Sequence, residues 1–132
     1  MAPVVAYPVA IKDDQVMLIR KKRGLVGGWQ LPGGAKEYGR PLKQAAQDEL
    51  YEETGLFAIP RDFTLVYATC EEFHRNVNIV FLCTEFAGEP EVHDTFEIAE
   101  ARFVPIGMVE QYLSGDHLKF AQKAIAMKQS VR

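Results

Sequence analysis

The sequence has few of the cysteine and histidine side chains that form disulfides or bind metal ions in small proteins. It has only two cysteines, Cys70 and Cys83, which stand far apart and not in a paired metal-binding spacing. We therefore expect two reduced, partly buried thiols. The three histidines also lack the spacing of metal ligands, so exposed or core roles are favoured for them.

Neither sign of charge dominates, and long apolar runs are absent. With a net charge of −3, a basic surface for a nucleic-acid polymer is not indicated, although a local basic cluster is enough for a small phosphorylated ligand. No apolar run approaches the roughly 20 residues of a membrane span, and the N-terminus does not read as a secretory signal. We expect no membrane partner and a cytoplasmic location.

Length and hydrophobicity are those of a globular protein, so we expect a single domain over residues 1–132 with a sizeable core. Apolar patterns and turn residues predict strands at 3–11, 15–22, 28–32, 63–73, 76–86 and 100–105. They predict helices at 41–54, 107–113 and 117–129. This order indicates an α/β protein, with a mixed β-sheet between helices in an α/β/α sandwich.

A glycine pair followed by an acidic helix is the most informative feature of the chain. Gly33 and Gly34 allow a close backbone approach to a ligand, or simply a tight turn. Glu49, Glu52 and Glu53 stand at i, i+3 and i+4, so they share one helix face, which we expect to point away from the core. They repel one another and lie in the negative half of the helix dipole. A Mg²⁺ ion against this face would relieve both costs.

This segment resembles the signature box of the Nudix hydrolases. The matching residues, at the right spacing, are Gly34, Glu49, Leu50, Glu52, Glu53, Gly55 and Leu56. The resemblance implies a Nudix-type α/β/α sandwich and hydrolysis of the diphosphate linkage in a nucleoside diphosphate derivative. It also implies Mg²⁺, or alternatively Mn²⁺, as the cofactor.

The resemblance assigns roles to the residues of the box. Glu52 and Glu53 are implied metal ligands, and Glu49 is a third ligand or the base that activates water. The carbonyl of Gly33 is a further implied ligand, and Gly34 is placed at the substrate. A solvated acidic helix face is the alternative for the glutamates.

Two box positions depart from the family pattern, because Arg40 replaces its first glutamate and Asp48 replaces its arginine. We interpret this exchange as a reversed ion pair. Eight helical residues span roughly 12 Å, so the pair requires the loop of Arg40 to fold back along the helix. Asp48 should also raise the pKa of Glu49.

The exchange leaves a rival function open. In that reading the chain is a weak or inactive Nudix-fold module that binds a nucleotide or a protein. A purely structural acidic helix is a third reading.

A basic run from Arg20 to Arg23 ends the second strand. We predict that Arg20 and Arg23 contact substrate phosphates, since arginine binds phosphate bidentately; a solvated strand end is the alternative. Alternation allows only every second residue of the run onto the site face. Near the last strand, Glu100 is by resemblance the predicted additional catalytic or metal-binding acid, with Glu97 as its alternative, and a plain surface charge is an equal alternative for either residue.

The substrate is not fixed by the sequence. Three markers that the resemblance associates with particular substrates are absent after the box: those for NADH, ADP-ribose and dinucleoside polyphosphates. The markers for ADP-ribose and dinucleoside polyphosphates would lie around residues 71–73. Oxidised nucleoside triphosphates stay plausible by chain length and resemblance alone. A homodimer is also left open.

Overall fold

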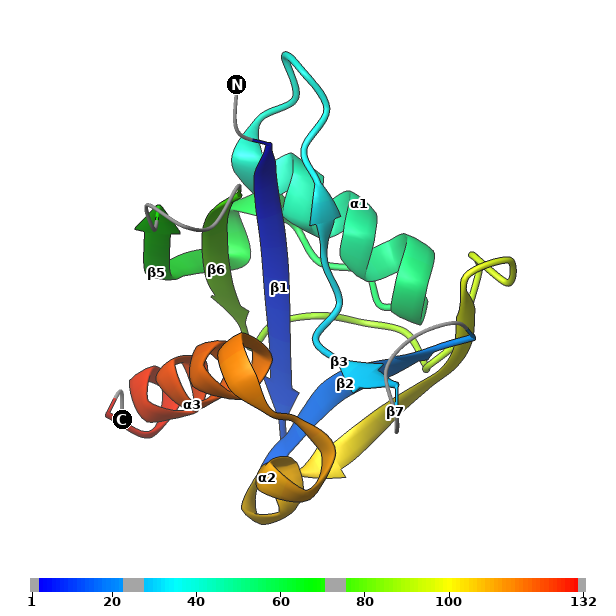
Figure 1. Cartoon of the computed structure of the whole chain (residues 1–132), viewed down its shortest axis with the longest axis vertical. Helices are drawn as coiled ribbons and strands as arrows, with labels where there is room; N and C mark the ends of the chain where they lie inside the picture. Colours follow the sequence, from blue (N-terminus) through cyan, green and yellow to red (C-terminus); the bar gives the residue numbers. More distant parts are fainter. Residues whose placement is uncertain (1–2, 23–27, 71–75, 131–132) are drawn as a thin grey trace.

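The computed structural model of the protein describes residues 3–22, 28–70 and 76–130, arranged as in Figure 1. The strands are β1 (Val4–Lys12), β2 (Gln15–Lys21), β3 (Trp29–Gln30), β4 (Gly34–Ala35), β5 (Phe63–Cys70), β6 (Val77–Cys83) and β7 (Ile98–Pro105). The helices are α1 (Leu42–Thr54), α2 (Val109–Tyr112) and α3 (Gly115–Ser130), with the 3-10 turns η1 (Pro60–Asp62) and η2 (Ile106–Met108). No helix in this part of the chain is long and apolar enough to cross a membrane.

One mixed seven-stranded sheet is built around β1. Its hydrogen-bonded order is β3-β2-β1-β6-β5, with β4 also paired to β1 and β7 paired to β2. β1 runs parallel to β6, with Val4 opposite Val77, and the other pairs are antiparallel. Asp13 and Asp14 join β1 to β2 with φ angles of 51° and 60°, the left-handed values that a two-residue hairpin turn needs.

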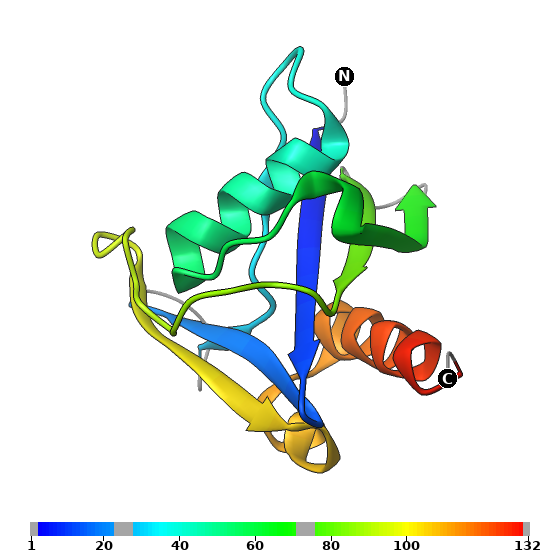
Figure 2. The ribbon, with the colours of Figure 1, turned by 180° about the vertical axis from the view of Figure 1, so that it is seen from behind.

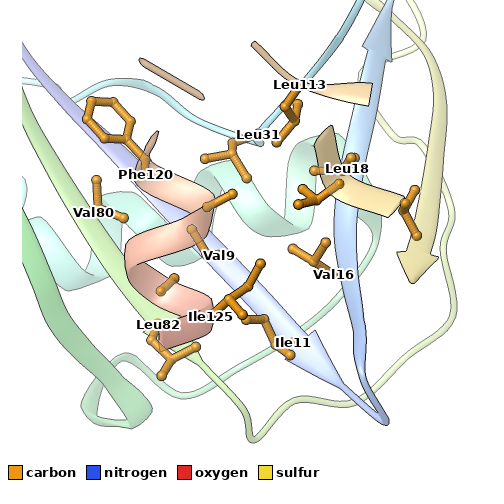
Figure 3. Close-up of a cluster of buried hydrophobic side chains, with 14 residues drawn as sticks. Val9, Ile11, Val16, Leu18, Leu31, Val80, Leu82, Leu113, Phe120 and Ile125 are labelled. Atoms are coloured by element: carbon orange, nitrogen blue, oxygen red, sulfur yellow. The ribbon is translucent and has the colours of Figure 1, made fainter. Parts of the chain in front are cut away.

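Alternate residues of the central strands enter two separate cores. Val9 of β1 and Leu18 of β2 belong to the core beneath α2 and α3, which Figure 3 shows from close by. Their chain neighbours Ala10 and Met17 point the other way, into the core beneath α1. Helices therefore cover both faces of the sheet, as Figures 1 and 2 show from opposite sides. The expected α/β/α sandwich with a mixed sheet is confirmed.

Helix α1 begins and ends close to the residues expected from the sequence. Pro41 is the N-cap, one position before the helix, and Gly55 caps the C-terminus with a φ of 78°. Beyond this cap, the N–H groups of His93 and Asp94 both donate to the carbonyl of Glu52. Carbonyls in the last helical turn have no partner within the helix. The loop of residues 91–94 is thereby held against the C-terminal end of α1.

Two short elements were missed by the sequence prediction. Gly34 and Ala35 form β4, where they pair with Ala6 and Val5 of β1, and the turn η1 precedes β5. A two-residue strand is too short to show a periodic pattern. Its pairing depends on how the chain packs in three dimensions.

Several element ends also differ from the prediction. β6 ends at Cys83, short of residue 86, because the chain leaves the sheet and Ala87 pairs with Phe57 through N–H···O bonds of 2.8 and 2.9 Å. β7 begins at Ile98, so Glu100 lies inside the strand and not at its start. The helix expected at 107–113 is η2 followed by the four-residue α2. The expected end of β5 at 71–73 lies outside the described residues.

Candidate active site

Glu53 is buried against the glycine turn. It is 4% exposed, and its Oε1 accepts the backbone N–H of Gly33 at 2.8 Å. No side chain fits at Gly33, because a Cβ atom there would lie 2.5 Å from a ring carbon of Tyr7. The expectation that all the box glutamates point away from the core is wrong for Glu53. The glycine turn crosses α1 at this point and covers the side chain, which the helical pattern alone does not reveal.

Glu49 lies over the second glycine of the turn. A Cβ atom on Gly34 would come within 2.5 Å of the carboxyl carbon and Oε1 of Glu49. Glycine is therefore the residue that leaves room for this carboxylate. Glu49 is half-buried and Glu52 is exposed, so the acidic face of α1 runs from the protein interior to the solvent.

The carboxyl groups of this face hold their protons more tightly than ordinary glutamates. Burial raises the pKa of Glu53 to about 8, helped by the charge of Glu49 and opposed by the N–H bond of Gly33. Burial likewise raises the pKa of Glu49 to about 7, with additional contributions from Glu52 and then Asp48. The predicted effect of Asp48 on Glu49 is thus present, behind two larger causes. A cation among these groups would favour their charged forms.

Two further charged residues act on this face and were not among the predicted site residues. Lys21, at the end of β2, lowers the pKa values of Glu49 and Glu53, whereas Asp94 in the loop after α1 raises both. Strand alternation from Met17 already places Lys21 on the α1 face of the sheet, so this signal was available in the sequence. Asp94 lies in an irregular loop, where the sequence offers no comparable signal.

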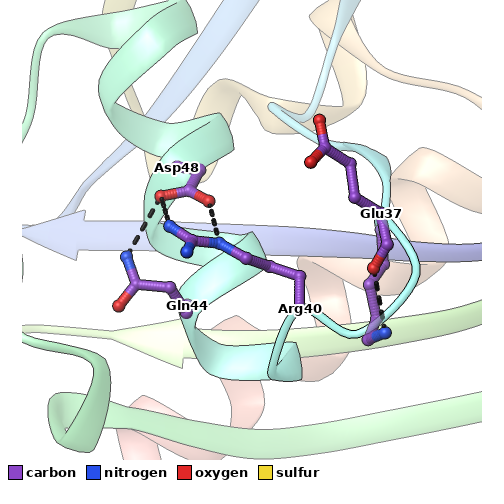
Figure 4. A network of polar contacts seen from close by, with 5 residues as sticks. Glu37, Arg40, Gln44 and Asp48 are labelled. Atoms are coloured by element: carbon purple, nitrogen blue, oxygen red, sulfur yellow. Dashed lines mark hydrogen bonds and ion pairs between the residues drawn. The ribbon is translucent and has the colours of Figure 1, made fainter.

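The reversed ion pair predicted from the sequence is present (Figure 4). The Nε of Arg40 donates to Asp48 Oδ2 at 2.8 Å and its Nη2 donates to Oδ1 at 2.9 Å. Gln44 donates a third hydrogen bond to Asp48 at 3.0 Å. The hydrogen bonds from Arg40 hold the pKa of Asp48 below its usual range. This pair ties the loop before α1 to the middle of the helix.

Arg20 and Glu100 lie together, but on the sheet face opposite to α1. They face each other across β2 and β7, with Arg20 Nη2 3.6 Å from Glu100 Oε1. The Nε of Arg102 donates to the same carboxylate at 2.8 Å. Both guanidinium groups lie over Trp29, which packs against the core beneath α2 and α3. The structure does not bring Arg20 and Glu100 to the box glutamates, and their predicted roles stay predictions; Arg23 lies outside the described residues.

The arrangement of a glycine turn over an acidic helix can be compared with known proteins. A sequence model of the NUDIX domain matches residues 2–125, which is nearly the whole chain. The chain belongs to the Nudix family. The resemblance that the box residues carry in the sequence is thereby confirmed.

Individual Nudix relatives agree with this assignment. The chain is 31% identical over 130 residues to an ADP-ribose pyrophosphatase of Methanocaldococcus jannaschii, covering 96% of this chain and 75% of that protein. It is 36% identical over 87 residues to an oxidized purine nucleoside triphosphate hydrolase of Danio rerio, covering 65% and 46%. Its fold matches a MutT NUDIX hydrolase from Burkholderia pseudomallei with a TM-score of 0.79, at 23% identity over 93% of this chain and 98% of that chain. The expected enzyme class, a Nudix pyrophosphohydrolase, is confirmed.

The Nudix carboxylates fit a hard divalent cation without forming a closed cage around it. Within residues 3–22, 28–70 and 76–130, no three His, Cys, Asp or Glu side chains converge closely enough to enclose an ion. Mg²⁺ does not need such a cage, because it takes one or two carboxylates and completes its shell with waters and phosphate oxygens. Glu49, Glu52 and Glu53 offer such oxygen ligands, and Mn²⁺ accepts the same donors. An ion would thus be shared between the protein and a phosphorylated substrate.

Proposed function

We propose that this Nudix chain hydrolyses the diphosphate linkage of a nucleoside diphosphate derivative with Mg²⁺, or alternatively Mn²⁺, as its cofactor. The observation that carries this proposal is the packing of the acidic face of α1 against Gly33 and Gly34. Burial and mutual repulsion there make the carboxylates costly to charge in the absence of a cation. A divalent cation bound together with a diphosphate removes that cost.

The glutamates have separate roles in this proposal. Glu52 holds the cation from the open side, the carbonyl of Gly33 is a further ligand, and Glu49 is left free to act on the attacking water. Glu53, fixed by the N–H of Gly33, is a ligand from the buried side and keeps the turn in place. When bound, the cation neutralises diphosphate charge and polarises phosphorus. Stabilising the developing phosphoryl charge supplies most of the acceleration.

Glu49 is the proposed general base. Burial raises its pKa to about 7 without a cation, and a bound cation would lower that pKa again, so Glu49 would be unprotonated at neutral pH and able to take a proton. It is also half-buried beside Gly34, which we propose to lie at the substrate. Lys21 is the proposed phosphate contact from β2, since its charge acts on Glu49 and Glu53. The predicted contributions of Arg20, Arg23 and Glu100 remain proposals for mutagenesis.

The substrate class follows from what the named relatives share. ADP-ribose and an oxidised purine nucleoside triphosphate differ in the group beyond the diphosphate, but both carry a nucleoside on one side of it. The sequence markers disfavour NADH, ADP-ribose and dinucleoside polyphosphates, so nucleoside triphosphates, oxidised or not, are the first candidates. We also propose a cytoplasmic location and a homodimer. Cell fractionation tests the location, and gel filtration of the purified protein tests the homodimer.

The deciding experiment is hydrolysis of a substrate panel with and without Mg²⁺, reading out phosphate and pyrophosphate. The panel contains nucleoside triphosphates, an oxidised guanosine triphosphate, ADP-ribose, nucleotide sugars and dinucleoside polyphosphates. We expect turnover that requires Mg²⁺ and falls at least about a hundredfold in Glu52→Gln. Glu89→Gln, at an exposed loop glutamate, is the matched control and should keep native activity. Mg²⁺ binding without turnover of any panel member would instead support the nucleotide- or protein-binding module.

A further inference from the structure

A pocket opens beside the acidic face of α1, between the end of β2 and the loop that precedes β7. Its volume is about 220 Å³, and Lys21, Lys22, Phe96 and Glu97 line it. Figures 1 and 2 show this loop beside both the end of β2 and the C-terminal end of α1. Pockets that hold a whole drug-sized ligand measure roughly 300–1,000 Å³. This one therefore has room for one group of a substrate and not for an entire nucleotide.

Phe96 presents its ring to solvent at this pocket. It is 84% exposed, although the loop that carries it is tied down on both sides. The N–H of Lys22 donates to the carbonyl of Glu97 at 2.8 Å, and the N–H of Ile98 donates to the carbonyl of Asp94 at 3.0 Å. The ammonium group of Lys22 also donates to the carbonyl of Thr95. The aromatic ring thus projects from a loop whose backbone is held in place.

The pocket adjoins the proposed site of hydrolysis. Lys21 lines the pocket and also acts electrostatically on Glu49 and Glu53. The N–H of Asp94, two residues before Phe96, donates to the carbonyl of Glu52 at 2.9 Å. The pocket and the acidic face thus share Lys21 and are joined by the loop of Asp94, so a group attached to a diphosphate at that face has this pocket beside it.

We propose that this pocket binds the nucleobase of the substrate, with Phe96 stacking on the base and Glu97 accepting hydrogen bonds from its amino group. Aromatic side chains stack on bases of every kind, because every base has a π-face. The carboxylate of Glu97 accepts hydrogen bonds and repels phosphate, which favours a base over a further phosphate as the occupant. Because the ammonium of Lys22 donates to the carbonyl of Thr95 in the loop, Lys21 is the lysine that we assign to the phosphate chain. This inference rests on the proposed hydrolase function.

Fluorescence tests the pocket without any turnover. Phe96→Trp places a reporter in the pocket, and Tyr38→Trp places a matched one at another exposed aromatic position. Tyr38 lies on the loop at the opposite end of α1, a helix about 20 Å long. With Mg²⁺ present, we expect methylene-bridged GTP or ATP analogues to quench Phe96→Trp saturably and to leave Tyr38→Trp unchanged. Inorganic triphosphate, which has no base, should not quench either variant.

Kinetics give an independent readout. We expect Phe96→Ala to lower the ratio of kcat/KM for a nucleoside triphosphate to kcat/KM for inorganic triphosphate about tenfold, mainly through KM. Tyr38→Ala should leave the ratio at its native value. Equal quenching of both tryptophan variants, no quenching of Phe96→Trp, or an unchanged ratio in Phe96→Ala would each overturn the base pocket.

The two proposals fail in different ways. If the hydrolase proposal is wrong, no Mg²⁺-dependent turnover is seen and Glu52→Gln behaves as the native protein, while the fluorescence titration still reports whether a base occupies the pocket. If only the base pocket is wrong, turnover still requires Glu52 and the Phe96 and Tyr38 variants respond alike.

Discussion

Asp48 adds a negative charge beside a helix face that already carries several carboxylates. It is tolerated because Arg40 binds it bidentately and keeps it ionised. The same contact brings the loop of Glu37 back along α1, where the charge of Glu37 acts on Glu52. We therefore infer that Arg40 acts on catalysis through the position of this loop and not through contact with substrate.

We predict that activity requires opposite charges at positions 40 and 48, and that it does not matter which of the two positions carries the positive charge. Arg40→Glu or Asp48→Arg puts two like charges together, which should push the loop off the helix and lower kcat/KM about tenfold. The double variant Arg40→Glu/Asp48→Arg restores the attraction and should recover most of the activity. A double-mutant cycle on kcat/KM measures the coupling.

Lys43→Glu is the control for this cycle, because it reverses an exposed charge on the same helix without touching the pair. A double variant as impaired as the worse single variant would contradict the positioning role. Higher activity in Asp48→Arg alone than in the native chain would point to the binding module, with the native Asp48 as the disabling residue.

At the scale of elements, the end of α1 and the loop after it form one unit. Gly55 has a φ of 78°, and a Cβ atom there would lie 2.5 Å from the carbonyl oxygen of Glu91. Gly39 has a similar φ of 81° with nothing within 4 Å. We predict that Gly39→Ala costs about 1–2 kcal/mol of the free energy of unfolding, the price of a left-handed alanine, and that Gly55→Ala costs more because the 91–94 loop must also move.

Urea unfolding of both variants measures this difference. If both variants unfold with the same m-value, the steric cost of moving the 91–94 loop is the additional free energy of unfolding that Gly55→Ala loses compared with Gly39→Ala. Equal destabilisation would show that the loop yields without cost. The 91–94 loop would then not be fixed by the end of α1, and Asp94 would not be held near the glutamates.

The sequence predicted correctly those elements whose ends are set by the backbone preferences of single residues. Pro41 and Gly55 gave the bounds of α1, because each restricts its own backbone, and the Asp13–Asp14 turn gave the first hairpin. The order of the predicted strands and helices, together with the family resemblance, was enough for a mixed sheet between helices. In contrast, β4 depends on β1 crossing the turn at Gly34, and no feature within residues 34–35 indicates that.

The candidate site was predictable to the same extent. The spacing of the box put Glu49, Glu52 and Glu53 on one face, but the burial of Glu53 depends on the glycine turn packed over it. Arg20 was predicted for the site from its charge alone. The alternation that places Lys21 on the α1 face puts Arg20 on the opposite face, so this placement could have been predicted from the sequence, whereas the pairing of Arg20 with Glu100 depends on the register of β2 against β7.

For the whole molecule, the buried glutamates should make stability depend on pH. The pKa of Glu53 is raised from 4.5 to about 8 and that of Glu49 to about 7. Between pH 4.5 and 8 the folded state keeps protons that the unfolded state has lost, so the free energy of unfolding falls as pH rises. We predict that the metal-free protein loses about 5 °C in Tm from pH 5 to pH 8, and that Mg²⁺ with a nucleotide restores it at pH 8.

Thermal unfolding of variants identifies the groups responsible for the fall in Tm between pH 5 and pH 8. Glu53→Gln keeps an oxygen for the N–H of Gly33 but has no proton to lose, so its Tm should change less between pH 5 and pH 8. Glu89→Gln, at an exposed position, should keep the native slope. A native protein whose metal-free Tm is flat or rises over this range would show that the carboxylates are not buried as described.

The central position of β1 has a consequence for how the chain is made on the ribosome. Among the described strands β1 is synthesised first, yet its parallel partner β6 begins with Val77, which pairs with Val4. More than half of the chain must therefore leave the exit tunnel before that edge of β1 is covered. Until then its apolar residues are shielded by the β2 hairpin, by β4 and by α1, all of which follow it closely in the sequence. Slow translation between α1 and β6 would lengthen this exposed period, and a nascent chain stalled there is where a chaperone would be most needed.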